Sequence, residues 1–115
     1  MTPKEFGYKT LTKSEDTDEV GSIMAYRFSE KRTLQAVIWD AHRKRWAYAP
    51  AIGTIYINDY MWWDRTAEVD RATAERIARQ IGIELPSEET LDEMCAEGER
   101  MGWDTGPPEE DGEED

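Results

Sequence analysis

The sequence contains very few of the residues on which most small enzymes and metal sites depend. Cys95 is its only cysteine and His42 its only histidine among 115 residues. A single cysteine excludes an intrachain disulfide, and neither residue belongs to a spacing typical of a zinc site. Gly-rich phosphate loops, the Gly-x-Ser-x-Gly elbow and the His-Glu-x-x-His helix are also missing. The sequence therefore identifies no enzymatic activity, and we expect neither a cofactor nor a metal ion.

Long apolar segments are missing as well. No stretch approaches the roughly 18 apolar residues that a membrane-spanning helix requires. Residues 1–13 also lack the apolar core of a secretory signal. Together with the single cysteine, these absences favour a cytoplasmic protein without membrane contact. Arginine outnumbers lysine nine to five, a composition that we associate with a bacterial or phage genome.

Basic residues are scarce in only one part of the chain. Residues 1–83 hold 12 acidic and 13 basic side chains, whereas residues 84–115 hold 14 acidic side chains and Arg100 as their one basic residue. The formal net charge of −12 therefore belongs to the last third. The end of the chain, from Gly106-Pro107-Pro108 onward, is too acidic and too poor in apolar residues to form a core. We expect one domain over residues 1–103 and a disordered acidic tail over residues 104–115.

Aromatic residues, by contrast, are plentiful: five Trp, five Tyr and two Phe are enough to build one core. In the first half of the chain, apolar and polar residues alternate as they do in half-buried antiparallel strands. Met24, Tyr26 and Phe28, for example, fall on one face of such a strand. We predict strands over residues 4–12, 20–28, 33–39, 45–49 and 52–57, with a bend or an end at Pro50.

The predicted strand over residues 33–39 has apolar residues on both faces. Ala36 and Ile38 fall on one face, and Val37 and Trp39 fall on the other. A strand of this kind is covered on both sides. The cover consists either of the chain's own elements, or of helices on one side and a second subunit on the other. A homodimer is therefore one of the alternatives.

The second half has helical periodicity with clear end signals. Asp70 is suited to cap a first helix and Gly82 to follow its end, although a start nearer Asp64 or Thr66 is an alternative. Ser87 is suited to cap a second helix, which Gly102 would end. The two apolar stripes consist of Ala74, Ile77, Ala78 and Ile81 in the first helix and of Leu91, Met94, Cys95 and Met101 in the second. We predict an α+β fold, in which an antiparallel meander of four to five strands packs against these two C-terminal helices.

The segment Asn58–Arg65 joins the two halves and carries the adjacent pair Trp62 and Trp63. Neighbouring side chains of an extended segment point to opposite sides. One ring is therefore expected to be buried and the other exposed, and the sequence does not say which. The exposed ring is the candidate anchor for a binding partner.

The isolated reactive residues have simple structural interpretations. His42 lies in a polar turn without a neighbouring nucleophile, and we interpret it as a solvated turn residue. Cys95 lies on an apolar stripe among acidic neighbours, which favours a buried and unreactive thiol. Four nearby carboxylates match no calcium loop, and we interpret them as capping or surface groups, namely Asp59, Asp64, Glu68 and Asp70.

A basic turn beside an aromatic residue offers a nucleic-acid hypothesis. Such a combination can hold a phosphate backbone while the ring stacks on a base. The acidic chain as a whole repels nucleic acid, so we do not expect direct binding. The residues of this alternative are His42, Arg43, Lys44, Arg45 and Trp46.

The leading functional hypothesis is a small, non-enzymatic protein-interaction module. Its acidic second helix would steer it onto a protein with a basic surface, such as a nucleic-acid-binding protein, and exposed aromatics would anchor the contact. An inhibitor, immunity or adaptor protein of a bacterium or phage fits this description, and regularly spaced carboxylates can imitate a nucleic-acid backbone. The predicted contact residues are Tyr60, Trp62, Trp63, Glu88, Glu89, Asp92, Glu93 and Glu97.

The alternative from another class is a small-molecule-binding or catalytic domain. Its pocket would lie between the sheet and the helices, where large aromatic side chains can form the walls. The residues predicted to line it are Trp39, Tyr56, Trp62 or Trp63.

Overall fold

The centre of the protein is a five-stranded antiparallel sheet with the strand order β4-β3-β2-β1-β5. The computed structural model describes residues 6–14, 16–29 and 33–106. The first four strands follow one another as hairpins, and β5 returns to pair with β1. The predicted α+β class and antiparallel meander are confirmed. The strands are β1 (Gly7–Thr12), β2 (Val20–Phe28), β3 (Leu34–Asp40), β4 (Arg45–Tyr48) and β5 (Thr66–Val69).

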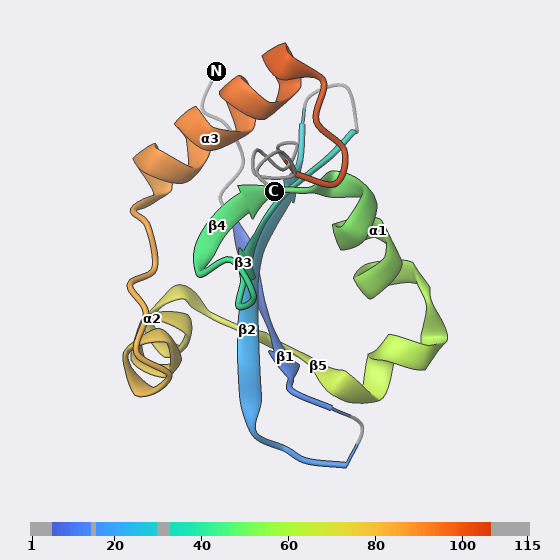
Figure 1. Ribbon diagram of the computed structural model, residues 1–115, viewed down its shortest axis with the longest axis vertical. Helices are drawn as coiled ribbons and strands as arrows, with labels where there is room; N and C mark the ends of the chain where they lie inside the picture. The colour runs from blue at the N-terminus through green and yellow to red at the C-terminus, as the bar shows by residue number, and fades with distance from the viewer. Residues whose placement is uncertain (1–5, 15, 30–32, 107–115) are drawn as a thin grey trace, which may run out of the picture.

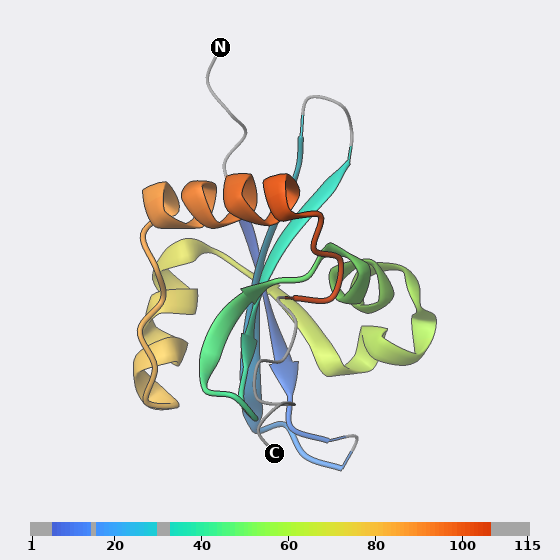
Figure 2. The ribbon, with the colours of Figure 1, turned by 45° about the horizontal axis from the view of Figure 1, so that its top comes forward.

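Helices cover both faces of the sheet (Figure 1, Figure 2). Helices α2 (Arg71–Gln80) and α3 (Glu88–Met101) pack on one face, as predicted. The other face carries helix α1 (Pro50–Asn58) and the short 3-10 helix η1 (Tyr60–Arg65). The second apolar face of β3 is therefore covered by the chain itself, so its apolar residues do not require a second subunit.

The two layers of core follow from the alternation within the strands. On the α2–α3 side, the buried residues include Tyr8, Ile23, Val37, Leu91 and Cys95. On the α1 side they are Leu11, Met24, Ala36, Ile38 and Ala49, against which Ile52, Tyr56 and Trp62 pack. The faces predicted for residues 20–28 and 33–39 are confirmed.

The strand predicted over residues 52–57 is wrong, because this segment lies inside helix α1. Its β-branched residues favour a strand by propensity, but tertiary packing decides the outcome. Pro50 opens the helix at its first turn, where its missing N–H costs nothing. Gly53 then faces the sheet, and a Cβ there would lie 2.7 Å from the Cβ of Ala36. The helix can therefore approach β3 closely, with Ile52 and Tyr56 one turn apart on the buried side.

The segment after α1 also departs from the prediction. Residues 66–69 form strand β5, which pairs with Tyr8–Leu11 of β1 and supplies the fifth strand. Helix α2 does not begin at Asp64 or Thr66 but after Asp70, whose carboxylate accepts the N–H of Thr73 at 2.8 Å. This strand is only four residues long, so its pattern of polar and apolar residues is too short to predict a strand.

The ends of α2 and α3 are largely as predicted. Ser87 caps α3, and Gly82 and Gly102 adopt the left-handed conformation after the two helices. Trp103 packs back on the core, but Met101, predicted on the apolar face of α3, is 53% exposed. Of the expected tail, the carbonyl of Asp104 accepts the N–H of Ala51 at 2.9 Å. Residues 107–115 lie outside the described residues.

Candidate functional site

Helix η1 sorts its side chains into rows, because a 3-10 helix has three residues per turn. Tyr60 and Trp63 form the row that faces solvent, and they are 73% and 61% exposed. Met61, in the next row, is 64% exposed. Trp62 and Arg65 form the row that faces the sheet. The exposed member of the tryptophan pair is therefore Trp63.

The backbone of η1 is held in place on several sides. The carboxylate of Asp59 accepts the N–H of Met61 at 3.0 Å. The indole N–H of Trp63 donates to the carbonyl of Ile57 at 3.1 Å. Arg65 fastens the end of the helix to Thr12 in β1. Three large exposed side chains are thus presented from an ordered backbone, and we call Tyr60, Met61 and Trp63 the η1 surface.

Some of the acidic residues of α3 face the sheet and fasten the helix to it. Glu88 accepts the Tyr8 hydroxyl at 3.1 Å, and Asp92 forms an ion pair with Arg27. Glu99 accepts the side-chain amide of Gln35 at 2.8 Å. Glu88 and Asp92, both predicted contact residues, therefore already have partners within the chain.

The remaining predicted acids form an outward row. Glu89, Glu93 and Glu97 lie at successive four-residue steps of α3, and all three are exposed. A step of four residues advances about 6 Å along a helix. The row is therefore a nearly straight series of negative charges on a helix that is fixed to the sheet.

The η1 surface and the acidic row do not lie together. Helix α3 packs on one face of the sheet and η1 on the other (Figure 2). The two features therefore belong to opposite sides of the molecule. A flat contact with one partner can include either of them but not both.

The basic turn consists of side chains with different surroundings. His42 and Lys44 are exposed. Arg43 pairs with Asp40, at 4.0 Å between Nε and Oδ2. The Nε atom of Arg45 is buried and has no hydrogen-bond partner within the described residues. The turn is therefore less uniformly available as a basic patch than its sequence suggests.

Trp46, the aromatic residue of the nucleic-acid alternative, is committed to the protein. Its indole N–H donates to the carbonyl of Glu84 at 3.1 Å, and its ring meets that of Trp39 edge-on at 5.5 Å. It lines a depression of about 660 Å³ between the β3–β4 turn and the end of α2. Because its N–H and one ring contact are used within the protein, Trp46 is less free to stack on a base than an exposed ring would be, and the geometry does not favour that alternative.

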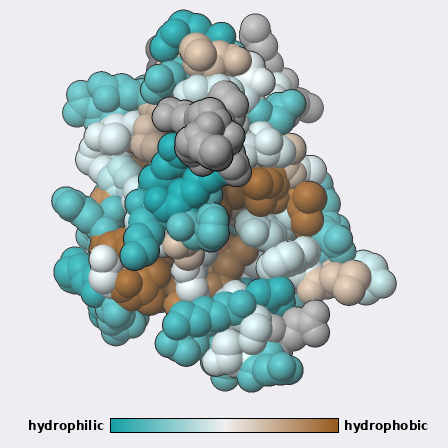
Figure 3. All heavy atoms as spheres, viewed as in Figure 1, coloured by the Kyte–Doolittle hydropathy of each residue, from teal (hydrophilic) through white to brown (hydrophobic). Residues whose placement is uncertain are grey.

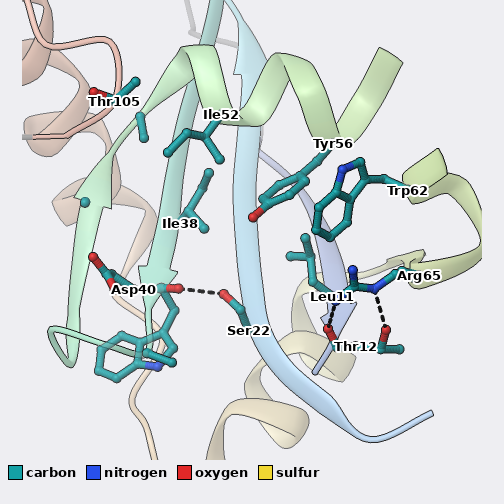
Figure 4. Close-up of a pocket in the computed structure, with 14 residues that line it drawn as sticks. Leu11, Thr12, Ser22, Ile38, Asp40, Ile52, Tyr56, Trp62, Arg65 and Thr105 are labelled. Carbon is teal, nitrogen blue, oxygen red and sulfur yellow. Dashed lines mark hydrogen bonds between the residues drawn. The ribbon is translucent and has the colours of Figure 1, made fainter. Parts of the chain in front are cut away.

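A second cavity lies between α1 and the sheet (Figure 4). Its volume is about 330 Å³, within the range of small-molecule sites. Three of the four aromatic residues predicted to line a pocket do so here, namely Trp39, Tyr56 and Trp62. Trp63 does not, because it faces solvent. Apolar side chains form most of the wall, including Leu11, Ile38, Ala49 and Ile52.

Two charged residues stand on opposite sides of this cavity (Figure 4). Asp40 accepts the backbone N–H groups of His42 and Arg43, at 3.0 and 3.1 Å, and so caps its own turn. Arg65 donates to the Thr12 hydroxyl at 3.3 Å and to its carbonyl at 3.0 Å. Arg65 forms no ion pair within the part of the chain that the structure describes.

The hydroxyl of Tyr56 points into the cavity between these charges (Figure 4). Its ring packs edge-on against Trp62, with 4.6 Å between the ring centres. Burial raises the pKa of Tyr56, while the charge of Arg65 lowers this pKa and that of Asp40 raises it. The hydroxyl thus lies within electrostatic reach of both groups, and it has no hydrogen-bond partner among the described residues.

The other candidate residues have structural positions. Cys95 is 1% exposed, and burial raises the pKa of its thiol to about 12, which leaves it protonated and unreactive. Asp59 and Asp70 cap helices, and Glu68 pairs with Lys9 at 3.1 Å. Within the described residues, no group of three His, Cys, Asp or Glu side chains is placed to hold a metal ion.

The aromatic wall of the cavity consists of residues predicted from the sequence, whereas its polar groups were not predicted. Arg65 reaches the site because η1 and β5 bring it beside Thr12, 53 positions earlier in the chain. Ser22 lies at the rim and donates its hydroxyl to the carbonyl of Trp39 at 2.7 Å. Nothing local in the sequence indicates these long-range neighbours.

Comparisons with known proteins add no assignment. The chain matches no protein-family model, no curated protein and no solved structure. Among the described residues, none of the helices has both the length and the apolar character needed to cross a membrane. The function must therefore be argued from the surface and the cavity.

Proposed function

We infer that the protein is a small, non-enzymatic interaction module that docks on a partner protein through the η1 surface. The observation that carries this proposal is the exposure of Tyr60, Met61 and Trp63 on an ordered six-residue helix. Trp and Tyr are enriched among the residues that dominate binding energy in protein interfaces. Large exposed apolar groups that lie close together are also uncommon on monomeric surfaces without a binding role.

The apolar surface extends from η1 towards α1. Ile55 of α1 is 48% exposed, and Figure 3 shows strongly hydrophobic residues at the surface over this helix. Trp63 donates a hydrogen bond to the carbonyl of Ile57 near the end of α1. The exposed side chains of α1 and η1 are therefore held next to each other. A partner that covers η1 can therefore bury part of α1 as well.

Charge determines the kind of partner that this proposal requires. The protein has a formal net charge of −12, and Asp64 beside the exposed rings is itself exposed. A partner with a basic surface around an apolar centre complements both features. The acidic row of α3 is on the far side and acts at long range, because the summed field of a protein accelerates encounter without direct contact.

The kind of protein predicted from the sequence is part of this proposal. An inhibitor, immunity or adaptor protein of a bacterium or phage, acting in the cytoplasm, is supported by the acidic charge and the single buried thiol. Nucleic-acid mimicry by Glu89, Glu93 and Glu97 is a second mode, supported by their regular exposed spacing. It predicts competition between nucleic acid and this protein for a shared partner.

A capture experiment with matched variants tests the proposal. The full chain is immobilised and exposed to lysate of its source cells, beside Tyr60→Ala/Trp63→Ala, Glu89→Gln/Glu93→Gln/Glu97→Gln and Phe28→Ala. Phe28 is the matched control, because it is 47% exposed at the far end of β2. We expect the aromatic double variant to lose a partner that the wild type and Phe28→Ala retain. If all four baits recover the same proteins, docking through η1 is excluded.

The Glu89→Gln/Glu93→Gln/Glu97→Gln variant distinguishes residues that speed association from residues that lie in the contact. Neutralising three outward acids is expected to slow association with the captured partner and to weaken its salt dependence. The dissociation rate should change little, because these residues lie outside the contact. A loss of binding through faster dissociation would instead place the partner on α3 and support the mimicry mode.

A further inference from the structure

The cavity between α1 and the sheet shares no lining residue with the η1 surface and has the composition of a ligand site. It combines an apolar wall with a few polar groups directed inward, the usual arrangement for small-molecule recognition. The apolar wall comes from β1, β3 and α1, and the polar groups come from β2, β3 and the end of η1. Its shape therefore depends on the whole fold and not on one loop.

The two charges at the cavity differ in how well they are compensated. Asp40 has two backbone N–H donors and the guanidinium of Arg43 as its neighbours. Among the described residues, the groups that contact the Arg65 guanidinium are the uncharged oxygens of Thr12 and the face of Trp62, whose ring centre lies 4.2 Å away. A half-buried guanidinium without a carboxylate partner favours an incoming anion, because its charge is otherwise only partly balanced.

The Tyr56 hydroxyl supports the same conclusion. It is directed into the cavity and is unpartnered among the described residues, so it can donate a hydrogen bond to a ligand oxygen (Figure 4). Its ring and that of Trp62 form a wall against which a flat apolar group can pack. The site thus offers a cation, a neutral donor and an aromatic wall.

We propose that this cavity binds a small monocarboxylate with an aromatic body, held by Arg65 and Tyr56. The carboxylate lies beside Arg65, and the ring lies between Tyr56 and the apolar wall formed by Leu11, Ile38 and Ile52. Asp40 lies on β3, two strand spacings from β1, or about 10 Å from the Arg65 side. Its negative charge disfavours a second anionic group at that end, so a dicarboxylate binds more weakly than a monocarboxylate.

Three ligands of nearly equal shape test the charge requirement. 4-Methylbenzoate carries one carboxylate, 4-methylbenzamide carries none, and terephthalate carries two at opposite ends. We expect the benzoate to bind at least about tenfold more tightly than the amide, the usual effect of a hydrogen bond to a charged group. Terephthalate should bind more weakly than the benzoate because of Asp40.

The readout is the set of five indole N–H signals in nitrogen-15 spectra of the full chain. Trp62 and Trp39 line the cavity, whereas Trp63 and Trp103 do not. We expect the benzoate to shift the Trp62 signal most and to leave the Trp63 and Trp103 signals in place. Equal shifts from the acid and the amide, no shift at millimolar benzoate, or larger shifts at Trp63 would each overturn the proposal.

Substitutions assign the binding to the two residues. Arg65→Gln is expected to lower benzoate affinity to the level of the amide, and Tyr56→Phe to weaken it about threefold to tenfold. Arg65→Lys keeps the charge and should keep the preference for the acid, which provides a second test if Arg65→Gln does not fold. Arg76→Gln, on the exposed side of α2 across the sheet, is the matched control and should bind as the wild type does. Retained acid preference in folded Arg65→Gln would refute the role of Arg65.

Discussion

The guanidinium of Arg65 lies over the ring of Trp62, with 4.2 Å between its central carbon and the ring centre. These residues are three positions apart, which is one full turn of a 3-10 helix. Their contact gives η1 an inner face and leaves Trp63 on the outer face. Adjacent tryptophans therefore serve different purposes, one in packing and one at the surface.

Alanine substitutions of the two tryptophans should have unequal effects on stability. Trp62→Ala removes a ring that packs against Tyr56 and Arg65, so we expect the free energy of unfolding to fall by about 2–4 kcal/mol. Trp63→Ala removes an exposed ring and one hydrogen bond, which should cost about 1 kcal/mol or less. Urea unfolding followed by circular dichroism measures both. Equal losses would contradict the division of η1 into rows.

The fold was predictable wherever its signals are local. The signals for the ends of α2 and α3 lie within a few residues of those ends. They are the capping residues Asp70 and Ser87 and the terminal glycines Gly82 and Gly102. Helix α1 was not predictable from its β-branched composition, because the close approach of Gly53 to Ala36 is a tertiary contact. Pro50, which suits the first turn of a helix, was the one available signal.

In the candidate site, too, only the features with local sequence signals were predictable. The aromatic lining was predictable, because large rings at a sheet-to-helix junction can form a wall. The position of Arg65 depends on the antiparallel pairing of β5 with β1, which joins segments more than 50 residues apart. That Arg65 has no ionic partner among the described residues is likewise a property of the folded surroundings.

Gly98 provides a test in which intrinsic helix propensity and packing act in opposite directions. Alanine is favoured over glycine inside a helix by about 1 kcal/mol. At this position, however, a Cβ would overlap the ring of Tyr48 in β4. We expect Gly98→Ala to lower the free energy of unfolding by about 1–3 kcal/mol. Glu97→Ala, on the exposed side of the same helix turn, should change it by less than about 0.5 kcal/mol. A stabilised Gly98→Ala would show that α3 does not pack tightly on β4.

Burial of the Cys95 thiol should make stability sensitive to alkaline pH. Burial raises the thiol pKa from 9.0 to about 12 in the folded protein, so the unfolded chain releases this proton first. The stabilisation is complete below pH 9 and is lost as the pH rises from 9 towards 12, at roughly 1.4 kcal/mol per pH unit. Cys95→Ala should therefore show a smaller decline than the wild type.

Urea unfolding at pH 7, 9, 10 and 11 measures this decline. Burial also raises the pKa values of Tyr26 and Tyr48 above 10.0, so part of the loss above pH 10 should remain in the cysteine variant. In the native protein at pH 8, an aromatic disulfide reagent should react with Cys95 only after the chain opens, because the residue is 1% exposed. Rapid modification of the folded protein would contradict the buried position.

Tyr8 connects three elements through one buried hydroxyl. The hydroxyl accepts a hydrogen bond from Nη1 of Arg71 in α2 at 2.8 Å and donates one to Glu88 in α3 at 3.1 Å. The ring of Tyr8 lies in the core. Tyr8→Phe keeps the ring but leaves both partners with one hydrogen bond fewer, so we expect a loss of about 1–3 kcal/mol. Tyr60→Phe is the matched control, because Tyr60 is 73% exposed and its hydroxyl makes no hydrogen bond to another described residue. If the two substitutions have the same small effect in urea unfolding, this hydroxyl does not hold α2 and α3 against the sheet.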